Sequence, residues 1–172
     1  IDCNRQPAVA SAFPEVSEAT VIPGNRNLDE AGKQARREAI FDPYHREIDA
    51  RLKTRVGRTV YYIAMHSFTP VYLGQERAMH VAVLYNRRPA LSLALGAALR
   101  AEPGLVVAEN DPYRVSDATD YGVPVHAEAG GLDYIEIEIR QDLIASVSGQ
   151  MAWAELLARL LPQAAERMLR TG

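Results

Sequence analysis

The sequence predicts an α/β protein with a largely parallel central sheet. Strand-like segments alternate with helical segments along most of the chain, and this alternation is typical of such a sheet. The clearest strand is the segment 134–140, in which isoleucine and charged residues alternate at every position. Because neighbouring side chains of a strand point to opposite faces, the isoleucines would lie on one face and Glu136, Glu138 and Arg140 on the other.

The charged face of this segment has two interpretations. At the edge of a sheet the charges are simply solvated, which is the ordinary case. Inside an α/β sheet, ionised side chains are costly unless they are paired or used at a functional site. The alternation of strands and helices in the rest of the chain favours the second interpretation.

The amino-terminal part predicts a long loop followed by two helices. Residues 6–27 carry three prolines and a glycine without sustained periodicity, and a loop of this length inside a domain is usually functional. Asp29 is suited to cap a helix over 30–41, which is rich in Ala, Arg and Glu. Pro43 is suited to start a second helix over 43–56, because proline is favoured in the first helical turn.

The middle of the chain predicts three strands and one helix. Residues 59–65 are rich in β-branched and aromatic side chains, so they form a strand that ends beside His66. A second apolar strand over 80–85 is followed by a helix of Ala and Leu over 90–100. A short strand over 105–108 comes after a Pro-Gly turn.

The last third predicts a loop over 110–121 and a short helix over 123–129, closed by two glycines before the isoleucine-rich strand. A final helix over 148–170 contains Pro162, and we expect it to be bent or interrupted there. We expect one domain over residues 1–172, because a chain of this length with 48% hydrophobic residues suffices for one core but not for two.

Composition excludes several classes of partner. The net charge of −3 comes from 22 acidic and 19 basic residues without a basic block, so a nucleic-acid partner is not expected. No run of about eighteen apolar residues predicts a membrane span. The single cysteine, Cys3, excludes an internal disulfide and fits a cytoplasmic location. Serine-nucleophile and glycine-rich phosphate-binding motifs are absent, which gives nucleotide chemistry little support.

Three polar side chains are expected at one edge of the predicted sheet. In α/β sheets the ligand site lies beyond the carboxyl ends of the strands, where Arg5, His66 and Arg140 would emerge. His66 follows an apolar strand, which suits a neutral imidazole that coordinates zinc. A lone histidine after a strand is more often structural, and no His-x-x-Glu, His-x-x-His or His-Glu-x-x-His motif completes a ligand set.

Other polar residues also have two interpretations. Asn4 and Arg5 form either a turn with a surface charge or a clamp that binds a carboxylate through two hydrogen bonds. Arg140 is either a second anion contact or the partner that keeps a buried glutamate ionised. His126 precedes the Gly-Gly turn and is ordinarily a helix-surface imidazole. The other two histidines are expected to be structural.

Four parts of the sequence, taken together, resemble the N-formylglutamate amidohydrolase family. They are Ile1–Arg5, Met65–Val71, Asp111–Arg114 together with Val125–Glu128, and Ile135–Asp142. The likeness covers nearly all of the chain and keeps the order of the segments. More distantly, the layout is similar to aspartoacylase and the succinylglutamate desuccinylases. The resemblance implies a three-layer, zinc carboxypeptidase-like (phosphorylase/hydrolase-like) fold, with a mixed, mostly parallel sheet flanked by helices.

The resemblance also implies roles for individual residues. It assigns substrate-carboxylate binding to Asn4 and Arg5, zinc binding to His66, and proton transfer with the zinc-bound water to Glu138. Arg140 and His126 are further candidates for substrate binding. In the relatives the other metal ligands precede the Asn-Arg pair. The chain starts without an initiator methionine, so we expect an amino-terminal portion, with the remaining zinc ligands, upstream of Ile1.

The activity implied by the resemblance is that of a zinc-dependent amidohydrolase. Its expected partner is a small N-acylated acidic amino acid, and the favoured reaction converts N-formyl-L-glutamate to formate and L-glutamate, as in histidine degradation. One alternative is a non-catalytic module that binds carboxylates through the Asn4–Arg5 clamp. Another is a hydrolase of the same fold that acts on a peptide or another N-acyl compound. Assembly into a homo-oligomer stays open.

Overall fold

The computed structural model describes residues 1–171, which fall into two compact units. The first unit comprises Ile1–Val60 and Ser116–Leu132. The second comprises Tyr61–Val115 and the residues from Asp133 onward. Each unit is therefore built from two separate stretches of the sequence.

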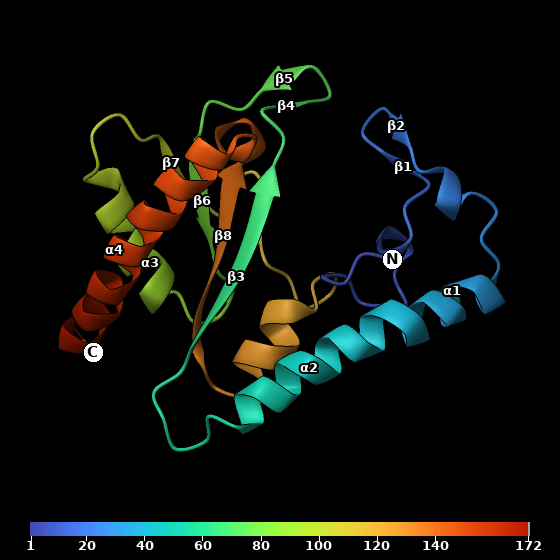
Figure 1. Ribbon diagram of the computed structural model, residues 1–172, viewed down its shortest axis with the longest axis horizontal. Helices are drawn as coiled ribbons and strands as arrows, with labels where there is room; N and C mark the ends of the chain where they lie inside the picture. Colours follow the sequence, from blue (N-terminus) through green and yellow to red (C-terminus); the bar gives the residue numbers. More distant parts are fainter. Residues whose placement is uncertain (172) are drawn as a thin grey trace. The chain divides into compact units, whose positions relative to one another are not determined.

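The second unit contains a four-stranded sheet with the order β3–β8–β6–β7 (Figure 1). Its strands are β3 (Tyr61–Phe68), β8 (Asp133–Arg140), β6 (Val81–Leu84) and β7 (Val107–Glu109). β3 runs parallel to β8 and β6 runs parallel to β7, whereas β6 and β8 are antiparallel. The predicted α/β class with a mixed, mostly parallel sheet is confirmed.

Strand β8 lies inside the sheet, between β3 and β6, so the edge interpretation of its charged face is wrong. Its isoleucine face forms the core of the unit together with two helices, α3 (Ala90–Arg100) and α4 (Val147–Thr171). Figure 1 shows both helices on the same side of the sheet. Burying one such aliphatic side chain contributes about 1.5–3 kcal/mol, so this face anchors β8 firmly.

The two core helices are amphipathic in the expected way. Leu91, Leu95 and Leu99 recur every four residues of α3 and are fully buried. Helix α4 continues through Pro162, so the predicted interruption is wrong. Among residues 1–171, no helix combines the length and apolar character that crossing a membrane requires.

A small hairpin that was not predicted follows β3. It pairs β4 (Val71–Tyr72) with β5 (Gln75–Glu76), and the turn between them places Leu73 and Gly74 at positive φ. The second unit also contains a 3-10 turn, η5 (Gln141–Ile144), directly after β8.

In the first unit, the two predicted helices form one helical segment. Helix α1 (Glu30–Arg36) passes through a π-helical turn, η3 (Arg37–Phe41), into α2 (Asp42–Lys53). The wider π turn accommodates a proline near the start of α2, where no backbone N–H is available. The predicted cap is confirmed, because the side chain of Asp29 accepts a 2.8 Å hydrogen bond from the N–H of Gly32.

The predicted long loop of the first unit contains short regular elements. They are the 3-10 turns η1 (Ala10–Ala12) and η2 (Pro23–Asn25) and the paired strands β1 (Val16–Ser17) and β2 (Thr20–Val21). The predicted short helix near residue 125 is a π-helical turn, η4 (Gly122–Glu128).

Candidate functional site

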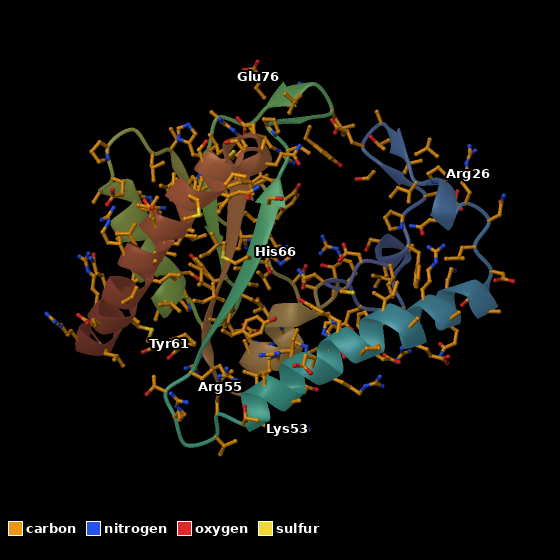
Figure 2. All side chains as sticks on the ribbon, in the orientation of Figure 1. Arg26, Lys53, Arg55, Tyr61, His66 and Glu76 are labelled. Carbon is orange, nitrogen blue, oxygen red and sulfur yellow. The ribbon has the colours of Figure 1, made fainter. Side chains whose placement is uncertain are left out.

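The second unit brings together His66 and Glu138, the predicted metal ligand and the predicted catalytic residue. They occupy the same register position in the parallel pair β3 and β8, so their side chains share one face of the sheet. Figure 2 shows His66 on β3. The strand runs to Phe68, which is buried, so it continues two residues beyond His66 and the predicted end at residue 65 is wrong.

Glu136, for which no role was predicted, joins these two residues. One ligand atom from each of His66, Glu136 and Glu138 lies within 4.8 Å of the others. The Nε2 atom of His66 is 3.8 Å from Oε2 of Glu136. The signal that could have found Glu136 is the alternation itself, since Glu136 and Glu138 are two residues apart on the same face.

Glu138 has His66 as its neighbour in β3 and a small residue as its neighbour in β6. Its register partner in β6 is Ala82, and the partner of Glu136 in β3 is Ala64. The register of three strands therefore determines where the carboxylates stand.

Burial makes this cluster unusual. Glu136 and Glu138 are each only 4% exposed, whereas the His66 side chain is 31% exposed. Two carboxylates held side by side away from water repel each other, and a cation or a proton must offset that repulsion. The cluster thus has a deep acidic end and an accessible imidazole.

These three side chains fit a divalent metal ion. Imidazole nitrogen and carboxylate oxygen are the ligands that catalytic zinc sites use. Two such donors bound to one ion at about 2.0–2.2 Å lie at most about 4.4 Å apart, and the His66–Glu136 distance is within that limit. The Oε2 atoms of both glutamates are buried and accept no hydrogen bond within residues 1–171.

Arg140 is the last residue of β8, and its guanidinium contacts a carboxylate and three backbone carbonyls. Its Nε donates a 2.8 Å hydrogen bond to Oδ1 of Asp142, and Nη2 donates to Oδ2 of the same carboxylate at 3.2 Å. Its Nη1 donates to the carbonyl oxygens of residues 77–79 at 3.1–3.4 Å. The partner of Arg140 is therefore Asp142, and the interpretation that Arg140 pairs with a buried glutamate is wrong.

Asn4 and Arg5 lie in the first unit, where residues 120–122 hold both of them. The Asn4 side-chain oxygen accepts a 2.9 Å hydrogen bond from the N–H of Gly122. The Arg5 guanidinium donates from Nη1 to the buried Asp120 and lies 3.7 Å from Asp2 through Nε. A guanidinium fixed in this way is oriented before any anion arrives, which favours carboxylate binding.

His126 is also in the first unit and is buried, so the expectation of a helix-surface imidazole is wrong. Its Nδ1 lies 2.8 Å from Oδ1 of Asp49, and its Nε2 lies 2.7 Å from Nδ1 of His45. The Nε2 of His45 in turn lies 2.9 Å from the carbonyl oxygen of Cys3. His80 has a structural role, as expected, because its Nδ1 accepts a hydrogen bond from the N–H of Val106.

Comparisons with known proteins agree with this architecture. Residues 1–145 match the family model FGase, described as N-formylglutamate amidohydrolase. The crystal structure of gene product Atu2144 from Agrobacterium tumefaciens is similar, with a TM-score of 0.90 and 38% identity over 97% of this chain and 67% of that one. No curated protein sequence matches the chain.

A second solved structure shares the fold. It is the N-formylglutamate amidohydrolase from Ralstonia eutropha JMP134, with a TM-score of 0.65 and 22% identity. The match covers 100% of this chain and 74% of that one.

Proposed function

We propose, since this chain belongs to the N-formylglutamate amidohydrolase family, that it hydrolyses the amide bond of an N-acylated acidic amino acid. The proposed substrate is N-formyl-L-glutamate, and the products are formate and L-glutamate. The observation that carries the proposal is the cluster of His66, Glu136 and Glu138, because amide hydrolysis needs an electrophile and a base in one place.

The proposed cofactor is one zinc ion, held by His66 and Glu136. A bound zinc ion polarises the scissile carbonyl and lets a water molecule lose a proton near neutral pH. His66 is suited to this role because its ring is partly exposed, whereas Glu136 is buried and fixed by an interior strand. The support for zinc comes from the donor types alone, which other divalent ions also accept.

Glu138 is the proposed catalytic residue. Its carboxylate accepts a proton from the attacking water and then delivers that proton to the leaving amine nitrogen, while the carbonyl carbon gains the oxygen. The bond between that carbon and nitrogen breaks, so one water is consumed for each formate released. An interior strand holds Glu138 rigidly, which suits a group that must stay within hydrogen-bond reach of the reacting atoms.

Asn4 and Arg5 are the proposed carboxylate-binding residues. The ion pair of Arg5 with Asp120 orients the guanidinium, and the remaining donors of the fork match a carboxylate in a plane. Arg140 and His126 are also proposed substrate contacts, although each already has protein partners.

Formate release tests the proposed function. The protein, loaded with zinc, is mixed with N-formyl-L-glutamate, and formate is measured by a coupled dehydrogenase assay or by NMR. The proposal predicts turnover that falls when the substrate is N-formylglutamine, whose side chain has no charge. Binding of N-formyl-L-glutamate without any formate release would instead support a non-catalytic carboxylate-binding module. Faster turnover of an N-acetyl or peptide substrate would support a different hydrolase.

A further inference from the structure

Four groups of the first unit form a hydrogen-bonded network that ends beside the proposed clamp. It links Asp49, His126, His45 and the carbonyl of Cys3 by contacts of 2.8, 2.7 and 2.9 Å. His45 and Asp49 are one turn apart on α2, and His126 lies on η4, the gold turn beside α2 in Figure 1. The next two residues after Cys3 are Asn4 and Arg5.

The two imidazole rings of this network are buried and closely packed. His45 and His126 are 5% and 3% exposed, and their rings stack with centroids 5.0 Å apart. The rings of Phe41 and Tyr121 pack against His45 at 4.2 and 4.3 Å. Asp49 is different, because 52% of its side chain is exposed. The Asp49 end of the network is therefore accessible to water, whereas the two rings are not.

Counting donors and acceptors gives the protonation state in which all three hydrogen bonds exist. A carbonyl only accepts, so Nε2 of His45 donates to Cys3, and a carboxylate only accepts, so Nδ1 of His126 donates to Asp49. One more proton lies between the rings. Two imidazoles share three protons in this state, so the pair carries a single positive charge.

The surroundings of His45 disfavour its charged form. Burial lowers the pKa of His45, and the adjacent His126 acts in the same direction, although the hydrogen bond to the Cys3 carbonyl opposes both. Ionisable groups close to the rings include Asp42, Tyr44 and Asp49 on α2 and Tyr121 before η4. The Asp49 carboxylate contacts His126, with 2.8 Å between Oδ1 of Asp49 and Nδ1 of His126.

We infer that His45 is a positioning residue for the Asn4–Arg5 clamp, and that it acts only while the His45–His126 pair carries one positive charge. Removing that proton breaks one of the three bonds, and adding a second makes two N–H groups face each other between the rings. Either change breaks the continuous series of hydrogen bonds between Asp49 and the Cys3 carbonyl in which His45 is held. The inference rests on the proposed function only in treating Asn4 and Arg5 as the carboxylate clamp.

The first test needs no substrate. Two-dimensional NMR of the protein, labelled with nitrogen-15, follows the imidazole nitrogens and the backbone N–H groups of Asn4 and Arg5 against pH. The inference predicts one imidazolium in the pair near neutral pH, and backbone signals of Asn4 and Arg5 that move with the same midpoint as the rings. Two neutral rings, or backbone signals that ignore the titration, would overturn it whatever the protein hydrolyses.

The second test uses Asp49, the exposed end of the network. Asp49→Asn replaces the charged acceptor of His126 by a neutral amide, so the pH profile of 1/KM is expected to differ from that of the unmodified protein while kcat changes little. Glu47→Gln is the matched control, because Glu47 is an exposed acid on the same helix that pairs with Arg51 instead. Identical pH profiles for the two variants, with normal turnover, would refute the inference and leave the proposed function standing.

The third test separates positioning from packing. His45→Ala removes the hydrogen bond to Cys3 and is expected to raise KM about tenfold. His45→Gln keeps an N–H donor near the position of Nε2, so it is expected to recover most of that loss. Equal KM values for His45→Gln and His45→Ala, in folded proteins, would show that the hydrogen bond has no positioning role.

Discussion

His66 and Glu138 are direct neighbours across the parallel strands β3 and β8. A proposed ligand and the proposed base are therefore held by backbone pairing rather than by a loop. The isoleucine face of the same strand is packed under α3 and α4, so a change on the functional face leaves that core intact. This separation makes the cluster suitable for substitution experiments.

Substituting each of the two buried glutamates separately tests their different roles. Glu138→Gln keeps the shape but cannot accept the proton, so kcat is expected to fall by about 10²–10⁴-fold with the metal retained. Glu136→Gln removes a charged ligand, so metal affinity is expected to fall by at least about tenfold. Formate release and chelator competition measure the two effects. Undiminished turnover of Glu138→Gln would remove Glu138 from the mechanism.

Arg5→Lys tests the carboxylate clamp while preserving the positive charge opposite Asp120. Lysine cannot present two parallel N–H donors, so KM for N-formyl-L-glutamate is expected to rise about tenfold or more with kcat little changed. Arg26→Lys, at an exposed position in the same unit, is the control and should behave like the unmodified protein. A KM unchanged in Arg5→Lys would refute the clamp.

Truncating one buried side chain in the core of the second unit is expected to lower stability strongly. Leu95→Ala empties a fully buried position of α3, so the free energy of unfolding is expected to fall by about 2–5 kcal/mol. Leu169→Ala, where the side chain is mostly exposed, should change it by less than about 0.5 kcal/mol. Urea denaturation with the metal removed measures both, which avoids stabilisation by binding. Equal effects would contradict the described core.

Asp142 is expected to make the stability of the fold depend on pH. Hydrogen bonds from Arg140 lower the pKa of Asp142 below its ordinary value of 3.8. A carboxyl with a lowered pKa stabilises the folded state above the unfolded pKa, and this contribution is lost as pH falls through the folded pKa. Asp142→Asn should therefore reduce the stability difference between pH 7 and pH 3. An unchanged difference in acid denaturation curves would show that the pair contributes nothing.

Local patterns predicted the sheet well and the hairpin poorly. The alternation of residues 134–140 was enough to predict which face of β8 carries charge, because the period of a strand is fixed by its backbone. The turn between β4 and β5 has leucine at positive φ, where glycine or asparagine is the usual signal. Sequence rules for turns could not detect it.

Long-range pairing limited what could be predicted of the site. Glu136 has the same alternation as Glu138, but the family resemblance singled out only Glu138. The contact between His45 and His126 joins residues 81 positions apart in the sequence, so no local pattern contains it. Each ring nitrogen has a partner only after the first unit has folded.

Metal content tests the central claim most directly. The protein, His66→Ala and the control His80→Asn are purified in parallel, dialysed with zinc and analysed by plasma mass spectrometry. Asparagine at position 80 keeps an acceptor for the Val106 N–H, so this control should fold normally. The account predicts about one zinc ion per chain in the protein and in the control, and its loss in His66→Ala. Full zinc retention by folded His66→Ala would contradict it.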